Sequence, residues 1–503
     1  MSSQNTRYDE TSLPMPDPNA VPEEHRGALS DLFDTWHAVK GRNARLTSYY
    51  NMKNLTKDLG VSIPPQLTGV NTVVGWASKA VKVMAVRSKF DGFVFGGQKN
   101  RVLDAMVRDN RLRTLYSMAV QSALVHGVAA FTVMRGKDGA PPKVRAYTAN
   151  QFAVLWDKDE GRIGAGIVLA DTDAAGTATK YVMHTADSVI TIERAGGDSG
   201  RGWEWRSRTE PHVMGRPLME PLVFDADGDR PLGHSRITPE VMGIIDKAMR
   251  DVLRMEVGAE FFTAPQRYIL GADEDLFDPT PLVAPEKAGD GGDDPALESD
   301  EAAPSKRAVA DRNMMVRAYI GSFLALTRDQ NGDVPTVGQF PAGDAHNFIA
   351  VFENDAQRFS GATNVPLGQL GVMSNTYTSS DALGAANDPL ILEVESMNAR
   401  NKETMEELAR MMMAVEHGVP IAELDDELKD VQASFIDPSM PTISARADAW
   451  TKIAASDEGI KGTRVWYEGL GLTQATIDRI EAEKGQTSAL ATLDSIAEQL
   501  GAI

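Results

Sequence analysis

The chain has 503 residues, a formal net charge of −20 and no cysteine. This length implies several domains and a sizeable hydrophobic core, and the lack of cysteine excludes disulfides and thiolate metal sites. The acidic charge argues against ordinary high-affinity nucleic-acid binding, which needs a basic surface, but it suits a surface that DNA only passes. Solubility alone is the alternative explanation of the charge. The chain has no signal-peptide pattern and no apolar run of about 18 residues, so we expect no membrane partner.

The N-terminal part predicts an arm followed by helices. Residues 1–22 are polar and rich in proline, and we expect a flexible arm that becomes ordered on a partner. Residues 23–50 and 70–86 carry apolar side chains at helical spacing and predict two helices. The alternating aromatic residues of RSKFDGFVFGG (87–97) predict a strand.

Residues 100–126 predict one or two helices, with a boundary at Asn110 and a stop at Gly127. His126 stands at the end of this helical stretch. We expect it to act as a C-terminal cap, because the helix dipole favours a cation there.

The next hundred residues predict β structure. Short strands joined by Gly-, Asp- and Pro-rich turns fill residues 128–171, with hairpin signals at KDG and DEGR. The β pattern continues at 181–192 and 203–207, and residues 215–235 predict a final strand and an irregular loop. Glycines in GRIGAGIVLAD (161–171) have the wrong spacing for a dinucleotide fingerprint, so this stretch favours a hairpin.

Two helices flank an acidic segment in the middle of the chain. Residues 238–262 predict a helix that Thr238 caps and Pro239 begins, and Asp344 is expected to cap a second helix over 344–359. Between them, residues 272–303 hold eleven Asp or Glu residues against one Lys, a composition that cannot fold alone. Strand-like patterns return at 314–326 and in VPTVGQF (334–340).

Residues 364–418 organise the rest of the chain. A Pro-Leu-Gly turn leads into a polar loop without charge before Asp381, and a helical pattern of about 35 residues follows, far longer than the usual helix. Such a helix needs neighbours along its length, so we interpret it as a strut in an assembly.

The C-terminal part predicts helices and loops. Residues 419–441 have helical and loop character, and 444–456 predict an amphipathic helix. Residues 464–484 predict two helices around the turn Gly469–Leu472, the second capped by Thr473, and 488–500 predict the last helix.

No catalytic constellation stands out in the sequence. A Walker-type phosphate loop, a zinc motif and an EF-hand are absent, and Ser235 in GHSRI does not form a nucleophile elbow. The eight histidines are scattered, and we expect them at surfaces or interfaces. We therefore predict no enzyme activity, no cofactor and no metal.

An ordered series of segments resembles the portal protein family of tailed bacteriophages. The resemblance covers nearly the whole chain and is greatest to portals of long-tailed phages of actinobacteria. It is carried by SYYNMKNLTKDLGVSIPP (48–65), VVGWASKAVKVMAVRSKFDGF (73–93), LYSMAVQSALVHGVAAFTVMR (115–135), 231–271, 363–402 and 448–484. It implies a mainly helical α+β portal fold with wing, stem, clip and crown regions, assembling as a ring.

The resemblance also implies a division of the chain. It assigns a flexible N-terminal arm (1–22), a wing (23–235), a first stem helix (236–263), a clip (264–343) with the acidic insertion 273–301, a second stem helix (344–363), a tunnel loop with a long wing helix (364–417) and a crown (418–503).

Three groups of site residues follow from the resemblance. The tunnel loop facing DNA would hold Ser374, Asn375, Thr376, Tyr377, Thr378 and Ser379. The stem helices would pack through Ile244, Ile245, Val252, Phe348 and Phe352. The clip would bind an adaptor through Tyr268, Leu270, Met315 and Phe323.

The implied function is a DNA channel at one capsid vertex, built by a ring of twelve copies. The implied partners are the terminase, a head-tail adaptor, the major capsid protein and double-stranded DNA passing without sequence specificity. The protein would reside in the virion at the head-tail junction, after assembly in the host cytoplasm. An oligomeric scaffold without a channel is one alternative. A hydrolase is another, and it would need a pocket of converging titratable groups.

Overall fold

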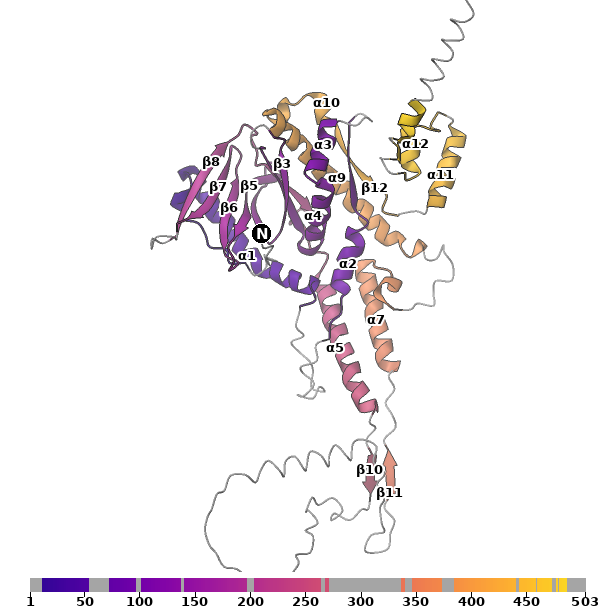
Figure 1. The fold of residues 1–503 in the computed structure, drawn as a ribbon. Helices are drawn as coiled ribbons and strands as arrows, with labels where there is room; N and C mark the ends of the chain where they lie inside the picture. The colour runs from indigo at the N-terminus through magenta and orange to yellow at the C-terminus, as the bar shows by residue number, and fades with distance from the viewer. Residues whose placement is uncertain are drawn as a thin grey trace, which may run out of the picture. The chain divides into compact units, whose positions relative to one another are not determined.

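A computed structural model of the chain describes residues 11–53, 72–95, 101–136, 140–196, 203–263, 267–270, 336–339, 346–372, 384–439, 443–457, 459–472, 476–477 and 479–485 (Figure 1). It divides into two compact units. The first consists of Met1–Val83, Gln121–Ala130 and Tyr147–Asn387, and the second of Met84–Val120, Phe131–Ala146 and Asp388–Ile503. More described residues lie in helices than in strands, and the sheets are antiparallel where their pairing is given, so the predicted mainly helical α+β class is confirmed.

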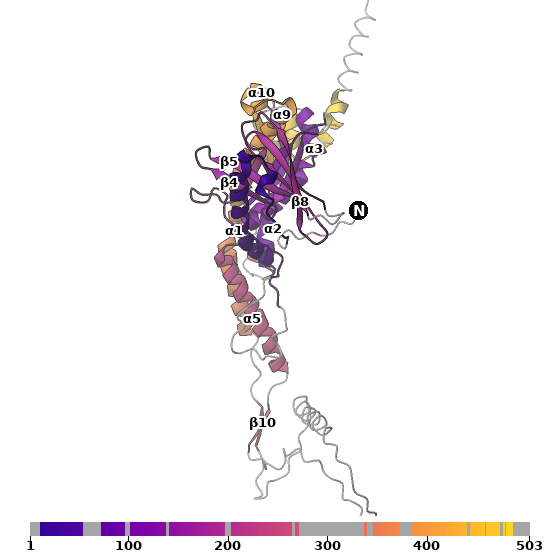
Figure 2. The same cartoon turned by 90° about the vertical axis from the view of Figure 1, so that its left-hand side faces the viewer.

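An antiparallel five-stranded sheet dominates the first unit, and each of its strands pairs with its neighbour in the chain (Figure 2). The strands are β4 (Phe152–Asp157), β5 (Arg162–Thr172), β6 (Ala178–His184), β7 (Ser188–Ala195) and β8 (Glu204–Pro211). The predicted DEGR turn joins β4 to β5, and Gly161 takes the left-handed φ of +62° there. Gly164 and Gly166 lie within β5, so this stretch is a hairpin strand, as predicted, and not a nucleotide loop.

Helix α1 (Arg26–Tyr50) covers one face of this sheet. The apolar positions that predicted the helix are buried in a shared core, where the rings of Phe33 and Tyr181 meet edge to face at 5.2 Å. The core on this face includes Leu29, Leu32, Phe33, Trp36, Ile167, Leu169, Tyr181, Met183, Ile190 and Ile192. Amphipathic spacing therefore identified this helix and its buried side.

A second core fills the opposite face of the sheet. It joins Phe152, Val168 and Val182 to residues of β2 (Val128–Met134), β3 (Lys143–Thr148) and β9 (Met219–Val223). These three strands form their own sheet in the order β3-β2-β9. Because both faces of β5 are covered, its sequence is nearly continuously apolar instead of alternating.

The expected flexible arm is ordered over its second half, which corrects the prediction for residues 11–22. Leu13 and Val21 are buried in the core under α1, and Ser12 forms a parallel bridge with Thr177. Tyr181 donates its hydroxyl to the carbonyl of Pro14 at 3.0 Å. The proline-rich composition gave no sign that Leu13 and Val21 would be buried, because the core that covers them forms only when the sheet folds. Residues 1–10 lie outside the described part.

Three helices in the N-terminal third of the chain follow the predicted pattern. They are α2 (Trp76–Ala85), which is shorter than predicted, α3 (Arg101–Asp109) and α4 (Leu112–His126). Asn110 marks the boundary between α3 and α4, and its side chain donates to the carbonyl of Met106 at 3.0 Å. Gly127 ends α4 with a φ of +102°, where an L side chain would be strained.

The second unit is built around the long helix α9 (Asp388–His417). Strands β1 (Lys89–Phe95) and β12 (Val431–Ile436) form an antiparallel pair in this unit, and Glu406 of α9 accepts a hydrogen bond from the backbone of Ala433 at 3.1 Å. A buried polar chain also reaches α9: Asn401 donates to the Tyr116 hydroxyl at 2.7 Å, and Ser88 donates to Asn398 at 2.6 Å. Burial raises the pKa of Tyr116.

Two predictions for this region were incomplete. Residues 431–436 were expected to be helical or loop, yet they form β12. The prediction missed this strand because its partner β1 lies more than 300 residues away in the sequence. The long helix was interpreted as a strut covered by neighbouring subunits. Its apolar side is instead buried within its own chain, from Leu390 through Met405 to Val415. Met411, Met412 and Met413 of this helix are all buried.

The C-terminal region contains short helices. They are α10 (Asp426–Lys429), α11 (Ile443–Ser456) and α12 (Arg464–Gly469), followed by helical residues at 479–485. Gly469 lies against the Trp450 ring so closely that a Cβ would overlap it. Thr473 and residues 488–500 lie outside the described part. Within the described ranges no helix is long and apolar enough to cross a membrane.

The core under α1 gives a stability prediction. Trp36 is 1% exposed, whereas Trp203 on the same unit is 57% exposed. We expect Trp36→Ala to lower the free energy of unfolding by about 3–5 kcal/mol, because it leaves a cavity in the core. Trp203→Ala removes a cation–π contact with Arg194 and should cost about 1 kcal/mol or less. Urea unfolding followed by tryptophan fluorescence measures both, and equal losses would contradict this account.

Candidate functional site

Helices α5 (Pro239–Thr263) and α7 (His346–Thr363) form an antiparallel pair in the first unit (Figure 1). The direction follows from the contacts, since Arg236 before α5 bonds Thr363 at the end of α7, and Lys247 bonds Asp355. The predicted cap is confirmed, because the Thr238 hydroxyl accepts a hydrogen bond from the backbone of Val241 at 3.3 Å.

The predicted apolar residues of the pair differ in burial. Ile244 and Ile245 are buried, and Val252, Phe348 and Phe352 are half-buried. Their partner was not predicted. Trp76 of α2 packs against two of the phenylalanines of α7, with ring centroids 5.1 Å from Phe352 and 5.2 Å from Phe359. These contacts hold α7 against the segment that begins α2.

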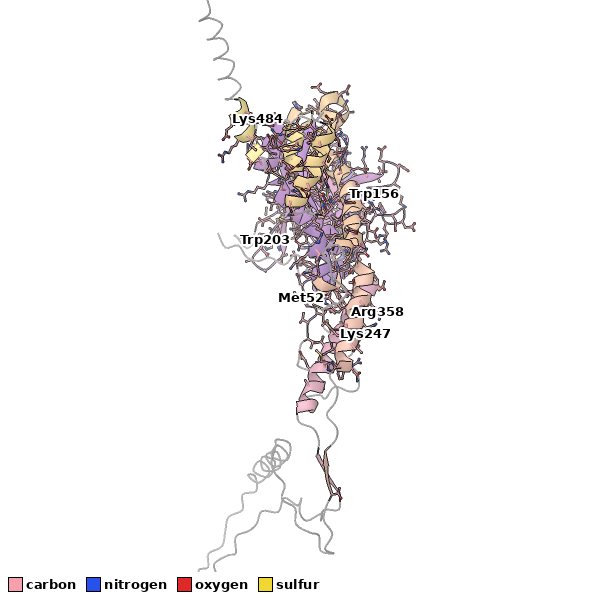
Figure 3. All side chains as sticks on the ribbon, turned by 90° about the vertical axis from the view of Figure 1, so that its right-hand side faces the viewer. Met52, Trp156, Trp203, Lys247, Arg358 and Lys484 are labelled. Atoms are coloured by element: carbon pink, nitrogen blue, oxygen red, sulfur yellow. The ribbon has the colours of Figure 1, made fainter. Side chains whose placement is uncertain are left out.

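A partly buried charge network also joins the two helices, and its bridging residue Lys247 is labelled in Figure 3. Lys247 donates to Asp355 at 2.6 Å and to Asp251 at 2.9 Å, and Arg254 donates to Asp251 at 2.9 Å. Asp355 has an exposed fraction of 0%. Sequence reasoning missed it, although its position three residues after Phe352 and four before Phe359 places it on the apolar face.

Arg236 ties the root of the helix pair together. It is 5% exposed, and its guanidinium donates to the carbonyl of Ala80 in α2 at 3.1 Å and to the carbonyl of Thr363. A buried arginine is tolerated when carbonyl oxygens accept from its fixed fork of donors. The guanidinium therefore holds the start of α5, the middle of α2 and the end of α7 in one arrangement.

The paired tyrosines at the end of α1 brace the same root. Tyr49 donates its hydroxyl to Asp246 of α5 at 2.7 Å, and Tyr50 bonds Gln121 of α4. Burial raises the pKa of Tyr49, and the carboxylate of Asp246 raises it further. The tyrosines thus fix α1 to α5 and α4 as neutral hydrogen-bonding groups.

His126 does not act as the predicted cationic cap. Its Nε2 atom lies 3.0 Å from the Thr47 hydroxyl of α1, and burial lowers the pKa of the ring to about 4. The imidazole is neutral at physiological pH, so it joins two helices and does not compensate the dipole of one.

The chain leaves α7 through a short ordered segment. Asn364 has a φ of +53°, residues 367–370 form a 3-10 turn, and Gly371 takes a φ of +81°. The side chain of Gln369 donates to Asn387 at 3.4 Å, so the segment before the predicted tunnel loop is bonded to the one after it. The predicted loop residues 374–379 lie outside the described part.

Strands β10 (Arg267–Leu270) and β11 (Thr336–Gln339) lie between α5 and α7 in the chain and pair antiparallel. They contain two of the predicted clip residues, Tyr268 and Leu270, which β10 brings opposite Gly338 and Thr336. Met315, Phe323, Asp344 and the acidic insertion lie outside the described residues.

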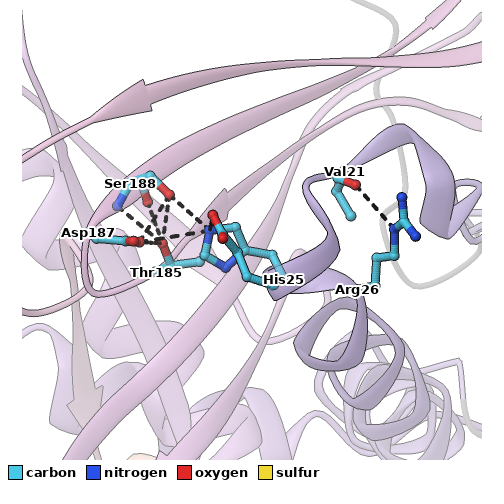
Figure 4. A network of polar contacts seen from close by, with 7 residues as sticks. Val21, His25, Arg26, Thr185, Asp187 and Ser188 are labelled. Atoms are coloured by element: carbon cyan, nitrogen blue, oxygen red, sulfur yellow. Dashed lines mark hydrogen bonds and ion pairs between the residues drawn. The ribbon is translucent and has the colours of Figure 1, made fainter.

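A polar network joins the turn after β6 to the start of α1 (Figure 4). His25 lies 3.8 Å from Asp187 and 3.4 Å from the Ser188 hydroxyl, while the Thr185 hydroxyl donates to Asp187 at 2.7 Å. The hydrogen bond from Thr185 lowers the pKa of Asp187. The described residues contain no cluster suited to a metal ion. The contacts of His25 with Asp187 and Ser188 hold the start of α1 against the β6–β7 turn.

His184 departs from the expectation of surface histidines. It is fully buried in β6, and burial lowers its pKa to about 3. It therefore belongs to the interior of the sheet as a neutral ring.

Arg236 gives a prediction for the root of the helix pair. We expect Arg236→Met to lower the free energy of unfolding by about 3 kcal/mol or more, because buried carbonyls lose charged donors. Arg206→Met removes an exposed arginine whose partner Glu204 is also exposed, and should cost about 1 kcal/mol or less. Thermal unfolding of both variants tests this, and a loss for Arg236→Met no larger than the control would refute it.

Comparison with known proteins identifies the family. The family model described as phage portal protein, SPP1 Gp6-like, matches residues 29–488. The chain is 26% identical over 424 residues to the portal protein of Mycobacterium phage D29, covering 82% of this chain and 79% of that protein. It is 25% identical over 454 residues to the portal protein of Mycobacterium phage L5, covering 88% and 84%.

Solved structures with a related chain come from gene transfer agent (GTA) particles. The neck of an empty GTA particle computed with C6 symmetry matches with a TM-score of 0.43 and 14% identity, covering 86% of this chain and 93% of that chain. The neck of a native GTA particle computed with C12 symmetry matches with a TM-score of 0.41 and 14% identity, covering 79% and 90%. Because the family model spans most of the sequence, this chain belongs to the SPP1 Gp6-like family of phage portal proteins.

Proposed function

We propose that this protein forms the ring-shaped DNA channel at one vertex of a phage capsid, through which the genome is packaged and later leaves. The observation that carries the proposal is the family match over residues 29–488. The two curated mycobacteriophage relatives, both called portal protein, support it. We infer a ring of twelve copies, located in the virion at the head-tail junction and assembled in the host cytoplasm.

The elements of the chain can be assigned to the regions of a portal subunit. We assign α5 and α7 to the stem, residues 264–343 to the clip and residues 372–387 to the tunnel loop. The bond between Gln369 and Asn387 supports the last assignment, since it closes a loop whose ends stay at the root of the stem. We assign α9 to the wing and residues 418–503 to the crown.

Electrostatics suit a conduit that DNA must pass without adhering. Twelve copies of the −20 chain carry about −240, which repels phosphate and limits the contacts that would slow DNA. On the helix pair, Lys247 and Arg254 already pair with carboxylates of the same chain. Their charge is therefore compensated before any DNA is present.

The proposed partners bind the ring one after another. The terminase docks on the ring and drives DNA inward, and a head-tail adaptor then binds the clip and closes the exit. The major capsid protein surrounds the ring, and the protein itself breaks no covalent bond. DNA is handled without reading its sequence, because a uniform acidic channel offers no base contacts.

Electron microscopy of the purified protein tests the ring. We expect negative-stain images to show closed rings with a central hole, with twelve subunits in the assembled particle. A monomer under capsid-assembly conditions would count against the portal role. A closed oligomer without a central hole would favour a scaffold that has no channel.

The tunnel-loop assignment has a separate test. We expect replacement of Asn375, Thr376 and Tyr377 by Lys to reduce packaging and DNA retention. Three added cations per subunit would bind the DNA phosphates and slow the passage of the duplex. Lysines at Asp159 and Glu160, which are exposed on the β4–β5 turn, serve as the control for added positive charge. Packaging that is equal in both variants and the wild type would show that this loop does not face DNA.

A further inference from the structure

The charge network between α5 and α7 has one cation bridging two carboxyl groups. Lys247 lies 2.6 Å from Oδ1 of Asp355 and 2.9 Å from Oδ2 of Asp251. Arg254 lies 2.9 Å from Oδ1 of Asp251, so the α5 carboxylate has two cationic partners. Among the residues that the structure describes, the carboxyl group of Asp355 has Lys247 as its single cationic partner. The two carboxyl groups are therefore held close together with unequal compensation.

The second oxygen of Asp355 is the unusual atom in this arrangement. Oδ2 is buried and has no hydrogen-bond donor among the residues that the structure describes. A buried carboxylate oxygen without a donor is costly, because it loses its hydration and gains nothing in return. A carboxylic acid at the same place removes that cost, since its O–H becomes a donor and needs only an acceptor.

Asp251 is the neighbouring carboxyl group. Its Oδ2 atom and Oδ1 of Asp355 lie 2.9 Å and 2.6 Å from the same Lys247 nitrogen, which brings the two carboxyl groups together. Two carboxyl groups at one site do not both ionise easily, and the better compensated one keeps its charge. Here Asp251 has the two cations and Asp355 is fully buried, so the asymmetry is built into the geometry.

We propose that Asp355 of α7 holds a proton that it donates to Asp251 of α5, which makes the packing of this helix pair sensitive to pH. The pair is then joined by an acid–carboxylate hydrogen bond as well as by the lysine bridge. Loss of the proton makes both carboxylates share the Lys247 ammonium group, while Arg254 bonds Asp251, and this weakens the junction. The proposal concerns the folded chain and does not depend on the ring.

The directions of the pKa shifts agree with this assignment. Burial raises the pKa of Asp355, and its contact with Asp251 raises it further against the effect of Lys247. Burial also opposes ionisation of Asp251, but the hydrogen bond and charge of Lys247 and the bond from Arg254 lower its pKa. The two partners therefore separate into an acid and a base, as carboxyl pairs do.

The sign of the pH effect follows from these directions. A group whose pKa is raised in the folded state stabilises the fold below its unfolded pKa and loses that contribution as the pH rises through the folded value. The Asp355 contribution therefore decreases as the pH rises. Asp251 acts in the opposite sense, since its lowered pKa gives a contribution that is lost as the pH falls.

Other charged groups lie on α5, α7 and the helices that contact them. On α5 they are Asp246, which bonds Tyr49 of α1, together with Glu240, Arg250 and Glu256. On α7 they are His346, Glu353 and Arg358, on α2 Lys79 and Lys82, and on the second half of α1 Lys40, Arg42 and Arg45. A comparison of variants at constant pH leaves all of these unchanged.

The test measures local opening of the helix pair in the full-length protein. Hydrogen exchange with mass spectrometry follows peptides from α5 and α7 at several pH values, after correction for the intrinsic exchange rate. We expect Asp355→Asn to keep wild-type protection at neutral pH, because the amide can donate in place of the acid. Asp251→Asn should open about tenfold faster or more, because it leaves Lys247 and Arg254 without their shared carboxylate.

The pH dependence isolates the proton. Wild-type protection relative to Asp355→Asn should fall as the pH rises, whereas Glu353→Gln, a matched α7 carboxyl variant, should show no such trend. Equal losses in Asp355→Asn and Asp251→Asn, with a difference from wild type that does not change with pH, would show that Asp355 is an ordinary ionised partner. If Asp355→Asn does not fold, the test is the pH dependence of hydrogen-exchange protection in α7 of the wild type. Protection that is constant or rises with pH overturns the proposal.

Discussion

The pairing of α5 with α7 depends on charged groups that lie at the contact between the two helices. A charge buried there must find a partner or be neutralised. Lys247 bridges the two helices, Arg236 holds their root, and Trp76 packs across α7. Breaking one of these bonds leaves a buried group without compensation, so the network favours one relative position of the helices over others that sliding would produce.

The rest of the first unit supports that junction. The five-stranded sheet has α1 on one face, and the end of α1 bonds α5 through Tyr49 and α4 through Tyr50. The ordered N-terminal segment adds Leu13 and Val21 to the same core. A load applied to the helix pair in a portal would therefore reach a packed sheet through short, buried hydrogen bonds.

Polar groups in the interior of this protein act mostly as neutral connectors. His126 joins Thr47, Tyr116 joins Ser88 and Asn401, and burial keeps each ring in its uncharged form. These groups link elements that are distant in sequence, and each satisfies donors that would otherwise be stranded. The interior is thus specified by paired polar groups as well as by apolar packing.

The sequence by itself determined the long amphipathic helices, the β-rich middle, the stops at Asn110 and Gly127, and the family, because these depend on local periodicity, turn chemistry and the order of segments. Tertiary structure alone decided that residues 431–436 pair with β1, that Leu13 anchors the arm, that His126 is buried and that Asp355 meets Lys247. Each of these depends on a partner far away in the chain, and local patterns contain no information about which distant group will supply the missing hydrogen bond, charge or apolar surface.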